Sequence, residues 1–372
     1  MKPLLIILGI LCILGVAAFF VFHGVQPRPP AVAKQAEGPV GEPELTVITA
    51  LAQSHDGHTL ATVNENKTVA LWDAATGTNL RALESSPNEW VFAPALSPDD
   101  SLLATAESSG GSDTHGSLLL WNPATGERLA SVENLPWPNS VSFNPAGTLI
   151  AVGGTPALYL VDPSTKEIIR QVDSAHQNGA IQAMAFSPSG ELLATAGRDG
   201  TVKLWKVPEL QLLRTISAGQ SVLAASRSEL GPGPAIVGSV AFAHHHPSLA
   251  ATTSEGKVLI WDLESGREIM RYAYEDSAAT GDNYFQVALG NSLSFTSDDR
   301  WLLTTDQHGT GIRLLGVDSK REIGGLLTTH TDSPIEAMNA SAADGSVAFA
   351  YRVFLPGQKA QTKFEIWKVR LR

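Results

Sequence analysis

Three consecutive histidines, His244-His245-His246, are the residues best suited by type to metal chemistry. Imidazole nitrogens are common zinc ligands, and His55 or His58 would extend the set. Neighbouring residues in a turn point in different directions, however, and no further ligands follow at the spacing of a metal site. We therefore interpret the three histidines as a solvated turn and expect no metal and no other cofactor.

A second group has the composition of a catalytic triad. His176, Thr195 and Asp199 supply a base, a hydroxyl and a carboxylate. The motifs that mark familiar active sites do not occur: the sequence has no G-x-S-x-G elbow, no phosphate-binding P-loop, no H-E-x-x-H and no C-x-x-C. A site dispersed over several parts of the chain stays open as an alternative.

The elements that would position these groups are predicted strands. Residues 192–216, LLATAGRDGTVKLWKVPELQLLRTI, contain three apolar stretches with the alternation of strands, separated by turn residues. Residues 181–187, IQAMAFS, add a fourth strand before a Pro-Ser-Gly turn. Together they predict a four-stranded antiparallel meander, which is too small to bury its own apolar faces. Such a sheet must pack against neighbours.

The same pattern repeats throughout residues 45–372. The segment after the third strand recurs as DAATGTNLRAL, NPATGERLASV, DPSTKEIIRQV, DLESGREIMRY and GVDSKREIGGL. Each third strand ends in an apolar anchor: Trp72, Trp121, Val161, Trp205, Trp261, Leu315 and Trp367. The anchors are about 40 to 56 residues apart, a repeat length typical of one propeller blade.

These repeats resemble WD repeats, a family of β-propellers, and the resemblance covers residues 45–372. It implies an all-β fold of seven four-stranded antiparallel blades. In that family a His, a Ser or Thr, an Asp and the Trp of the third strand share a hydrogen-bond network. The matching residues here are His176, Thr195, Asp199 and Trp205 of the fourth blade, so the resemblance implies a buried structural brace and not a catalytic triad.

The N-terminal residues 1–23 predict a transmembrane helix. About nineteen uncharged, mostly apolar residues separate Pro3 from His23, which is close to the length that crosses a bilayer. A long signal peptide cleaved near Ala33 is the alternative. The predicted location is therefore a single-pass membrane protein with an exported propeller, or a protein secreted after cleavage.

Residues 24–44 are rich in Pro, Gly and Ala and predict a linker. WD-repeat rings are usually closed by an N-terminal strand that joins the last blade. The residues available for this, 40–45, include Pro43. We therefore expect a short, weak closure or a last blade of three strands.

Four long insertions, at residues 108–116, 218–235, 275–286 and 352–362, predict the working surface. Each falls between the second and third strands of a blade or between two blades, and in a propeller these connections lie on one face. Loops on a rigid scaffold commonly carry function. The candidate partner-binding residues on this face are Trp90, Trp137, Tyr284 and Arg352, although the tryptophans would also fit as core at the rim.

The charge of the chain disfavours two classes of partner. Its net charge is −11 and its pI about 5.4, without the basic patch that nucleic-acid binding requires. A small-molecule substrate is disfavoured because no catalytic motif is present. We predict a membrane-anchored, non-catalytic scaffold for protein–protein interaction, with an alternative in a hydrolase-like or lactonase-like propeller enzyme whose site lies on the central channel.

Overall fold

The computed structural model describes twelve segments of the chain, and every regular element in them is a β-strand. The described segments are residues 31–39, 48–64, 67–85, 89–109, 115–177, 179–219, 235–273, 293–305, 311–328, 335–340, 346–353 and 361–370. Residues 32–369 form one compact unit.

The strands form seven four-stranded sheets, which we call blades one to seven. Blade one contains β2 (Ile48–Gln53), β3 (Thr59–Asn64), β4 (Val69–Asp73) and β5 (Asn79–Leu83). Blade two contains β6 (Glu89–Leu96), β7 (Leu103–Ser109), β8 (His115–Trp121) and β9 (Arg128–Pro136). Blade three contains β10 (Ser140–Phe143), β11 (Ile150–Gly153), β12 (Leu158–Asp162) and β13 (Glu167–Val172).

The remaining blades follow in chain order. Blade four contains β14 (Ile181–Phe186), β15 (Leu192–Gly197), β16 (Thr201–Lys206) and β17 (Gln211–Ser217). Blade five contains β18 (Val237–Phe242), β19 (Ser248–Thr253), β20 (Lys257–Asp262) and β21 (Glu268–Ala273). Blade six contains β22 (Leu293–Phe295), β23 (Trp301–Thr305), β24 (Gly311–Gly316) and β25 (Arg321–Thr328). Blade seven contains β26 (Ile335–Ala340), β27 (Ser346–Val353), β28 (Gln361–Arg370) and β1 (Ala31–Pro39).

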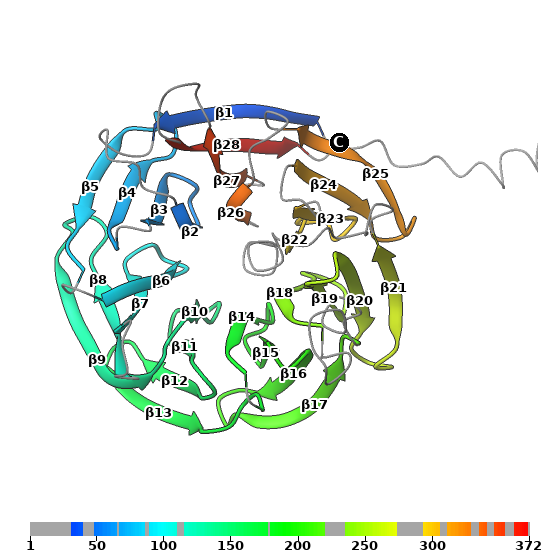
Figure 1. The fold of residues 1–372 in the computed structure, drawn as a ribbon, viewed down its shortest axis with the longest axis horizontal. Coiled ribbons are helices and arrows are strands. Elements are labelled where there is room, and N and C mark those ends of the chain that lie inside the picture. Colours follow the sequence, from blue (N-terminus) through cyan, green and yellow to red (C-terminus); the bar gives the residue numbers. More distant parts are fainter. Residues whose placement is uncertain are drawn as a thin grey trace, which may run out of the picture. The chain divides into compact units, whose positions relative to one another are not determined.

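The blades form a closed ring around a central axis (Figure 1). The first strand of each of blades one to six is innermost, as is β26 of blade seven, and each of these strands contacts the innermost strands of the two neighbouring blades. The contacts between β22 and β26 and between β26 and β2 complete the circle. The prediction of an all-β propeller built from four-stranded antiparallel blades is confirmed.

The hydrophobic core lies between the blades. Each of the seven seams holds one cluster of buried apolar side chains, with members from both adjoining blades. At the seam between blades seven and one, for example, Trp72 shares a cluster with Ala348 and Ile366. Because both faces of a blade are covered in this way, each blade owes its stability to its neighbours.

In each of blades one to six, the fourth strand carries a β-bulge beside the apolar anchor of the third strand. In blades one and four the register shifts between Leu71 and Trp72 and between Leu204 and Trp205. The extra residues, Leu80 and Leu213, point outwards and are 49% and 51% exposed. A bulge increases the local twist of a strand and interrupts its free edge, so it hinders pairing with another sheet.

The prediction about how the ring closes needs correction. Strand β1 forms from residues 31–39, inside the predicted linker 24–44, and lies beside β28 in blade seven (Figure 1, blue and red). The expectation of a weak closure through residues 40–45 or a three-stranded last blade is therefore wrong. An outermost strand needs hydrogen-bond partners on one side only, so the sequence AVAKQAEGP suffices although it lacks regular apolar alternation, and Pro39 can end the strand.

The predicted anchor, residues 1–23, lies outside the described residues. Among the residues that are described, no helix has the length and apolar character needed to cross a membrane.

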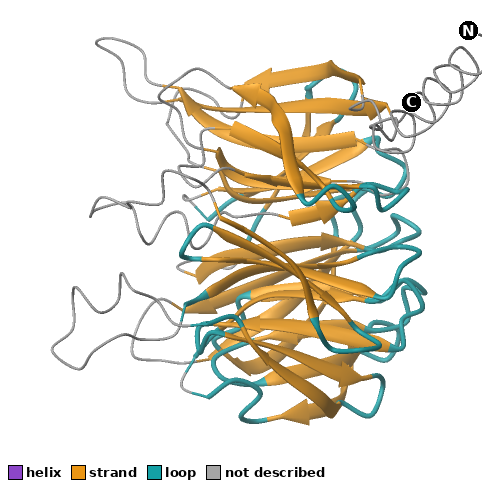
Figure 2. Ribbon diagram, turned by 90° about the vertical axis from the view of Figure 1, so that its right-hand side faces the viewer, coloured by secondary structure: helices purple, strands orange, loops and turns teal. Residues whose placement is uncertain are grey.

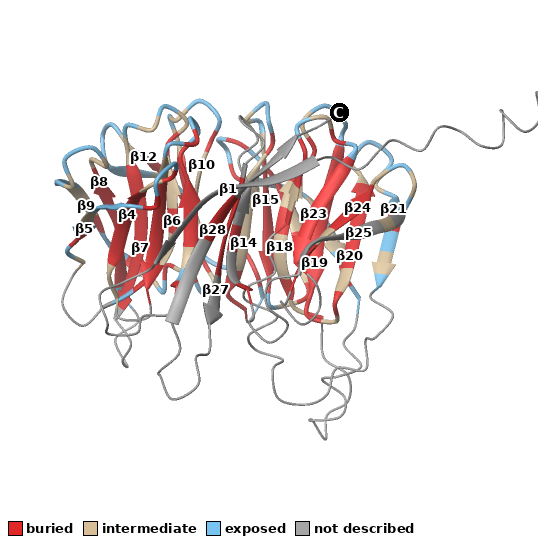
Figure 3. Cartoon of the chain, turned by 90° about the horizontal axis from the view of Figure 1, so that it is seen from above, coloured by how far each residue is buried: buried red, intermediate tan, exposed pale blue. Residues whose placement is uncertain are grey.

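The ring has two unlike faces. The turns between first and second strands, and between third and fourth strands, lie on one face, which we call the turn face (Figures 2 and 3). The opposite face, the loop face, receives the connections between second and third strands and between blades. The described strands that flank the four predicted insertions end on this face, but residues 110–114, 220–234, 274–292 and 354–360 lie outside the described part of the chain.

Candidate interaction surface

The structure brings together the four network residues predicted in blade four. His176 comes from the connection between β13 and β14, and Thr195 from the middle of β15. Asp199 lies in the turn after β15, and Trp205 near the end of β16. Two strands, a turn and the connection from the preceding blade therefore meet at this point of the loop face.

The four side chains form a chain of hydrogen bonds. The Trp205 indole Nε1 donates to Thr195 Oγ1 at 3.0 Å. Thr195 Oγ1 lies 2.7 Å from His176 Nε2, and His176 Nδ1 lies 2.9 Å from Asp199 Oδ1. A histidine protonated on Nδ1 satisfies every partner, because it accepts from the threonine hydroxyl and donates to the carboxylate.

Further donors hold the Asp199 carboxylate in its ionised form. Burial alone would raise its pKa, but bonds from His176 and from the Thr201 hydroxyl, at 2.7 Å, outweigh that effect and lower the pKa to about 2. The backbone N–H groups of Gln177 and Thr201 also donate to it, at 3.1 Å and 3.0 Å. Asp199 therefore ties the connection before blade four to the turn between β15 and β16.

Glycine at position 197 makes room for this network. A Cβ atom there would lie 2.0 Å from His176 Nδ1 and 2.7 Å from Asp199 Oδ1. No side chain can occupy that space while the histidine stays in place. The network therefore depends on the one residue that lacks a side chain.

Burial argues against nucleophilic catalysis by this group. Both His176 and Thr195 are 0% exposed, and the threonine oxygen already accepts a bond from Trp205. A nucleophile must reach its substrate, and nothing can approach Thr195 without displacing the histidine. The geometry suits a brace that fixes the loop face of blade four.

Blades one and two retain only part of the network. The Trp72 indole donates to Thr62 at 2.9 Å, and the Trp121 indole donates to Thr105 at 3.0 Å. Two residues after Thr105, where blade four has glycine, blade two has the fully buried Glu107. The threonine–tryptophan bond is thus the element that these blades share.

The first predicted partner-binding residue, Trp90, is 43% exposed at the start of β6. The ammonium group of Lys67 lies 5.1 Å from the centre of its ring, within the range of a cation–π interaction. Lys67 comes from the turn between β3 and β4 of blade one, where its backbone φ is +71°. No sequence motif indicated this contact, because it joins two blades.

The second tryptophan, Trp137, is 37% exposed between β9 and β10. Its backbone φ of +43° is unfavourable for a bulky side chain. The backbone is closely packed here: a Cβ atom on Gly154 would lie 2.3 Å from the carbonyl oxygen of Pro136 and 3.3 Å from that of Trp137. Strain that surrounding structure maintains is often found at functional positions.

Both tryptophans belong to one area at blades two and three, which we call the tryptophan patch. Trp90 pairs with Ser108, and Ser108 pairs with Gly116 across blade two. A Cβ atom on Gly116 would lie 2.6 Å from the Pro138 ring, next to Trp137 in the chain. The innermost strands β6 and β10 are also in contact.

The other predicted partner-binding residues cannot be placed on this patch. Tyr284 lies outside the described residues. Arg352 belongs to β27 and pairs with Thr362 of β28, but its side chain is not among those described. Both remain predictions.

Few groups suited to chemistry lie elsewhere in the described part of the ring. Among the described side chains of the innermost strands, none is ionisable. No three His, Cys, Asp or Glu residues of the described segments are grouped so as to hold a metal. His244, His245 and His246 lie on the turn face and contact Asp299 of the next blade.

A family model described as "WD domain, G-beta repeat" matches residues 42–73 and 168–206. The second match includes all four residues of the blade-four network. Among curated proteins, the chain is 25% identical over 286 residues to transducin beta-like protein 3 of Bos taurus, which covers 63% of this chain and 34% of that protein.

Two further relatives are similar over shorter segments. The chain is 30% identical over 176 residues to the serine-threonine kinase receptor-associated protein of Gallus gallus, covering 45% of this chain and 46% of that protein. It is 30% identical over 187 residues to small ribosomal subunit protein RACK1y of Oryza sativa, covering 50% and 49%. The chain therefore spans about a third to a half of the length of these relatives.

The location predicted from the sequence needs correction. The described residues contain no helix able to cross a membrane, and the relatives include a small ribosomal subunit protein. These findings overturn the prediction of a single-pass membrane protein with an exported propeller, or of a secreted one. The prediction depended on a count of uncharged residues, which measures apolar length and nothing about structure.

Repeated sheets, the threonine–tryptophan bonds of three blades and the matches to known proteins point to one family. The chain carries WD40 repeats, matched at residues 42–73 and 168–206, on a β-propeller fold, and it is similar to WD-repeat proteins.

Proposed function

We propose that this protein is a non-catalytic scaffold that binds a protein partner on its loop face, with the tryptophan patch as anchor. The observation that carries the proposal is the exposure of Trp90 and Trp137 in positions that the fold holds fixed. Tryptophan is enriched among the residues that contribute most to binding at protein interfaces. A rigid anchor loses little conformational entropy when it binds.

The names of relatives support a role in protein association. The Gallus gallus relative is named for its association with a serine-threonine kinase receptor. The described parts of this chain also favour binding over catalysis, because the described side chains of the innermost strands lack ionisable groups and Thr195 is fully buried. A propeller enzyme with its site on the central channel has less support.

Chemical crosslinking of the tagged full-length protein in an extract of its source, followed by mass spectrometry, tests the proposal. The double variant Trp90→Ala/Trp137→Ala is compared with Leu80→Ala/Leu213→Ala, which removes apolar surface of similar exposure from the outer strands. We expect the first variant to recover the crosslinked partner at least about tenfold less well, since hot-spot truncations cost about 2 kcal/mol or more. Full recovery by the tryptophan variant, or loss confined to the leucine variant, would reject the patch as the binding site.

A further inference from the structure

The turns between the first and second strands of the blades, which we call inner turns, follow one backbone plan. In each of the six described inner turns, the N–H of the first residue donates to the carbonyl oxygen of the sixth; the first residues are Ser54, Ser97, Asn144, Ser187, Ala243 and Thr296. In five of them the fourth residue has a positive φ, between 57° and 75°. Three of these residues are glycine: Gly57, Gly147 and Gly190. The other two are aspartate, Asp100 and Asp299, which adopt this conformation less readily than glycine.

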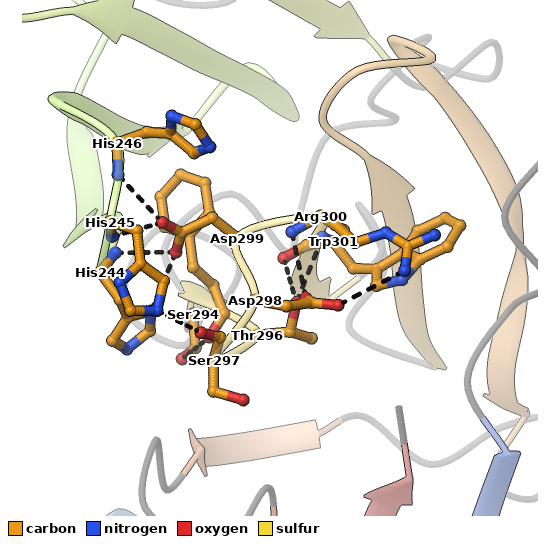
Figure 4. A network of polar contacts seen from close by, with 11 residues as sticks. His244, His245, His246, Ser294, Thr296, Ser297, Asp298, Asp299, Arg300 and Trp301 are labelled. Carbon is orange, nitrogen blue, oxygen red and sulfur yellow. Dashed lines mark hydrogen bonds and ion pairs between the residues drawn. The ribbon is translucent and has the colours of Figure 1, made fainter. Parts of the chain in front are cut away.

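Asp299 of blade six binds the inner turn of blade five (Figure 4). Its Oδ1 accepts bonds from the backbone N of His244 at 2.7 Å and from His244 Nδ1 at 3.0 Å. Its Oδ2 accepts bonds from the backbone N of His245 at 2.5 Å and of His246 at 3.1 Å. The side chain is 2% exposed, so these donors replace its water.

Asp100 makes the equivalent contact at the seam between blades one and two. Its two oxygens accept bonds from the backbone N of His55 at 2.7 Å and of Asp56 at 3.0 Å. His55 and His244 are both the second residue of their inner turns. Aspartate at the fourth position therefore faces a free backbone donor at the second position of the preceding turn.

Two glycine seams show the opposite pairing. A Cβ atom on Gly147 would lie 3.5 Å from Cδ of Pro98, and one on Gly190 would lie 3.5 Å from Cδ of Pro145. These prolines are the second residues of the preceding inner turns, and proline has no N–H to donate. A carboxylate at either place would meet a ring instead of a donor. At these two seams, a proline at the second turn position faces a glycine at the fourth position of the next turn. At the other two seams, a histidine at the second position faces an aspartate.

We propose that the inner turns of neighbouring blades are coupled in pairs, and that Asp299 with residues 244–246 is an ionic latch that holds blade five to blade six. The chain leaves blade five at Ala273 and enters blade six only at Leu293, so the covalent link restrains this seam weakly. The latch supplies a restraint on the opposite face. Its specificity comes from the pairing, because a carboxylate fits only where donors face it.

The charged and titratable groups around Asp299 are His244, His245 and His246 on blade five and Asp298 and Arg300 on its own turn. Burial raises the pKa of Asp299, but the N–H donors of the three histidines and the His244 ring outweigh that effect and lower it below its ordinary value. A carboxylate with a lowered pKa stabilises the folded state above its unfolded-state pKa, and this stabilisation is lost as the pH falls. The latch therefore weakens in acid.

A double-mutant cycle at pH 7 tests the coupling. His244→Pro removes a donor from the buried carboxylate, and we expect it to lower the apparent Tm by about 2–6 °C; Asp299→Gly should lower it by a similar amount. The double variant His244→Pro/Asp299→Gly recreates the proline–glycine pairing found between blades two and three. It should therefore lower the apparent Tm by less than the more damaging of the two single substitutions does. The parallel cycle His55→Pro and Asp100→Gly should behave alike. Additive losses in both cycles would overturn the proposal.

Hydrogen exchange keeps the test decisive should His244→Pro fail to fold. Asp299→Asn preserves shape and removes the charge, and it should speed exchange of the 244–246 amides at least about fivefold while leaving those of 55 and 56 unchanged. Unchanged exchange at 244–246 would contradict the latch.

In acid, the Tm difference between wild type and the double variant should shrink from pH 5 to pH 3. A constant difference would show that the carboxylate is not the holding group.

Discussion

Blades four and two share a threonine–tryptophan hydrogen bond but differ at the loop-face end of their second strands. In blade four, Gly197 leaves space that His176 and Asp199 fill. In blade two, Glu107 takes the equivalent place and is fully buried. One backbone plan therefore accommodates two side-chain arrangements.

The difference distinguishes the hydrogen bond that packs the strands of a blade from the contacts that hold the connections on its loop face. The tryptophan anchors of blades one, two and four each donate to a threonine. This bond therefore belongs to the packing of the second strand against the third. The His176–Asp199 pair adds something else, because it binds backbone groups of two loop-face connections. Blade four thereby gains a rigid loop face as well as a stable core.

The largest effect is expected from placing the blade-two residue in blade four. Gly197→Glu puts a Cβ atom 2.0 Å from His176 Nδ1, so the histidine must leave its site. We expect the free energy of unfolding to fall by about 5 kcal/mol, because overpacking costs about 1–3 kcal/mol and each buried group that loses its partner costs about 1–3 kcal/mol more. Chemical denaturation measures it. Glu107→Gly in blade two is the matched control, and a Gly197→Glu protein as stable as wild type would show that the space is not restricted.

Removing the threonine hydroxyl that both blades share should destabilise blade four more than blade two. Thr195→Val leaves both Trp205 Nε1 and His176 Nε2 without a partner. Thr105→Val leaves only Trp121 Nε1 without a partner. Each buried unsatisfied group costs about 1–3 kcal/mol, so we expect about 2–4 kcal/mol in blade four and about half that in blade two. Equal losses, measured by urea denaturation, would mean that His176 contributes nothing to the network.

The pH dependence of blade four should follow Asp199. Its pKa of about 2 lies below the ordinary value of 3.8, so the carboxylate stabilises the fold above about pH 4 and loses this contribution as the pH falls towards 2. Wild type should exceed Asp199→Asn by about 1–2 kcal/mol at pH 6. The gap should narrow steadily below pH 4 in denaturation series. If the difference in unfolding free energy between wild type and Asp199→Asn did not change with pH, the charge of Asp199 would not contribute to stability.

The smallest effect concerns the surface of blade two. Lys67→Met keeps the length of the side chain but removes the charge that lies over Trp90. An exposed cation–π pair contributes about 0.5–1 kcal/mol, so stability should change by no more than that. The emission of Trp90, obtained by subtracting the spectrum of Trp90→Phe from that of the parent in each background, would report the loss of the contact. An unaltered emission spectrum would contradict it.

The sequence predicted the propeller because repetition is encoded locally. The turn after each third strand and the anchor before it recur at nearly constant spacing, and strands that cannot pack alone must pack on their copies. The resemblance to WD repeats then implied the grouping of His176, Thr195, Asp199 and Trp205, which the structure brings within hydrogen-bond distance. Both inferences needed only residues close in the chain.

Contacts between blades were harder to predict. The Lys67–Trp90 contact and the Asp299 latch join residues of different repeats, and their partners depend on ring geometry. A signal for the latch was present nonetheless, since SPDD and TSDD replace glycine by aspartate at the fourth turn position. Strand β1 escaped prediction because an outermost strand needs no apolar alternation.

Amide hydrogen exchange in Asp199→Ala is the most direct test of the claim that blade four carries an additional brace on its loop face. The Gln177 and Thr201 amides donate to the carboxylate that this substitution removes. We predict that both amides exchange at least about tenfold faster than in wild type, while the amides of Glu107 and Ser117 in blade two keep their rates. Unchanged exchange at Gln177 and Thr201, or equal acceleration in both blades, would contradict the account.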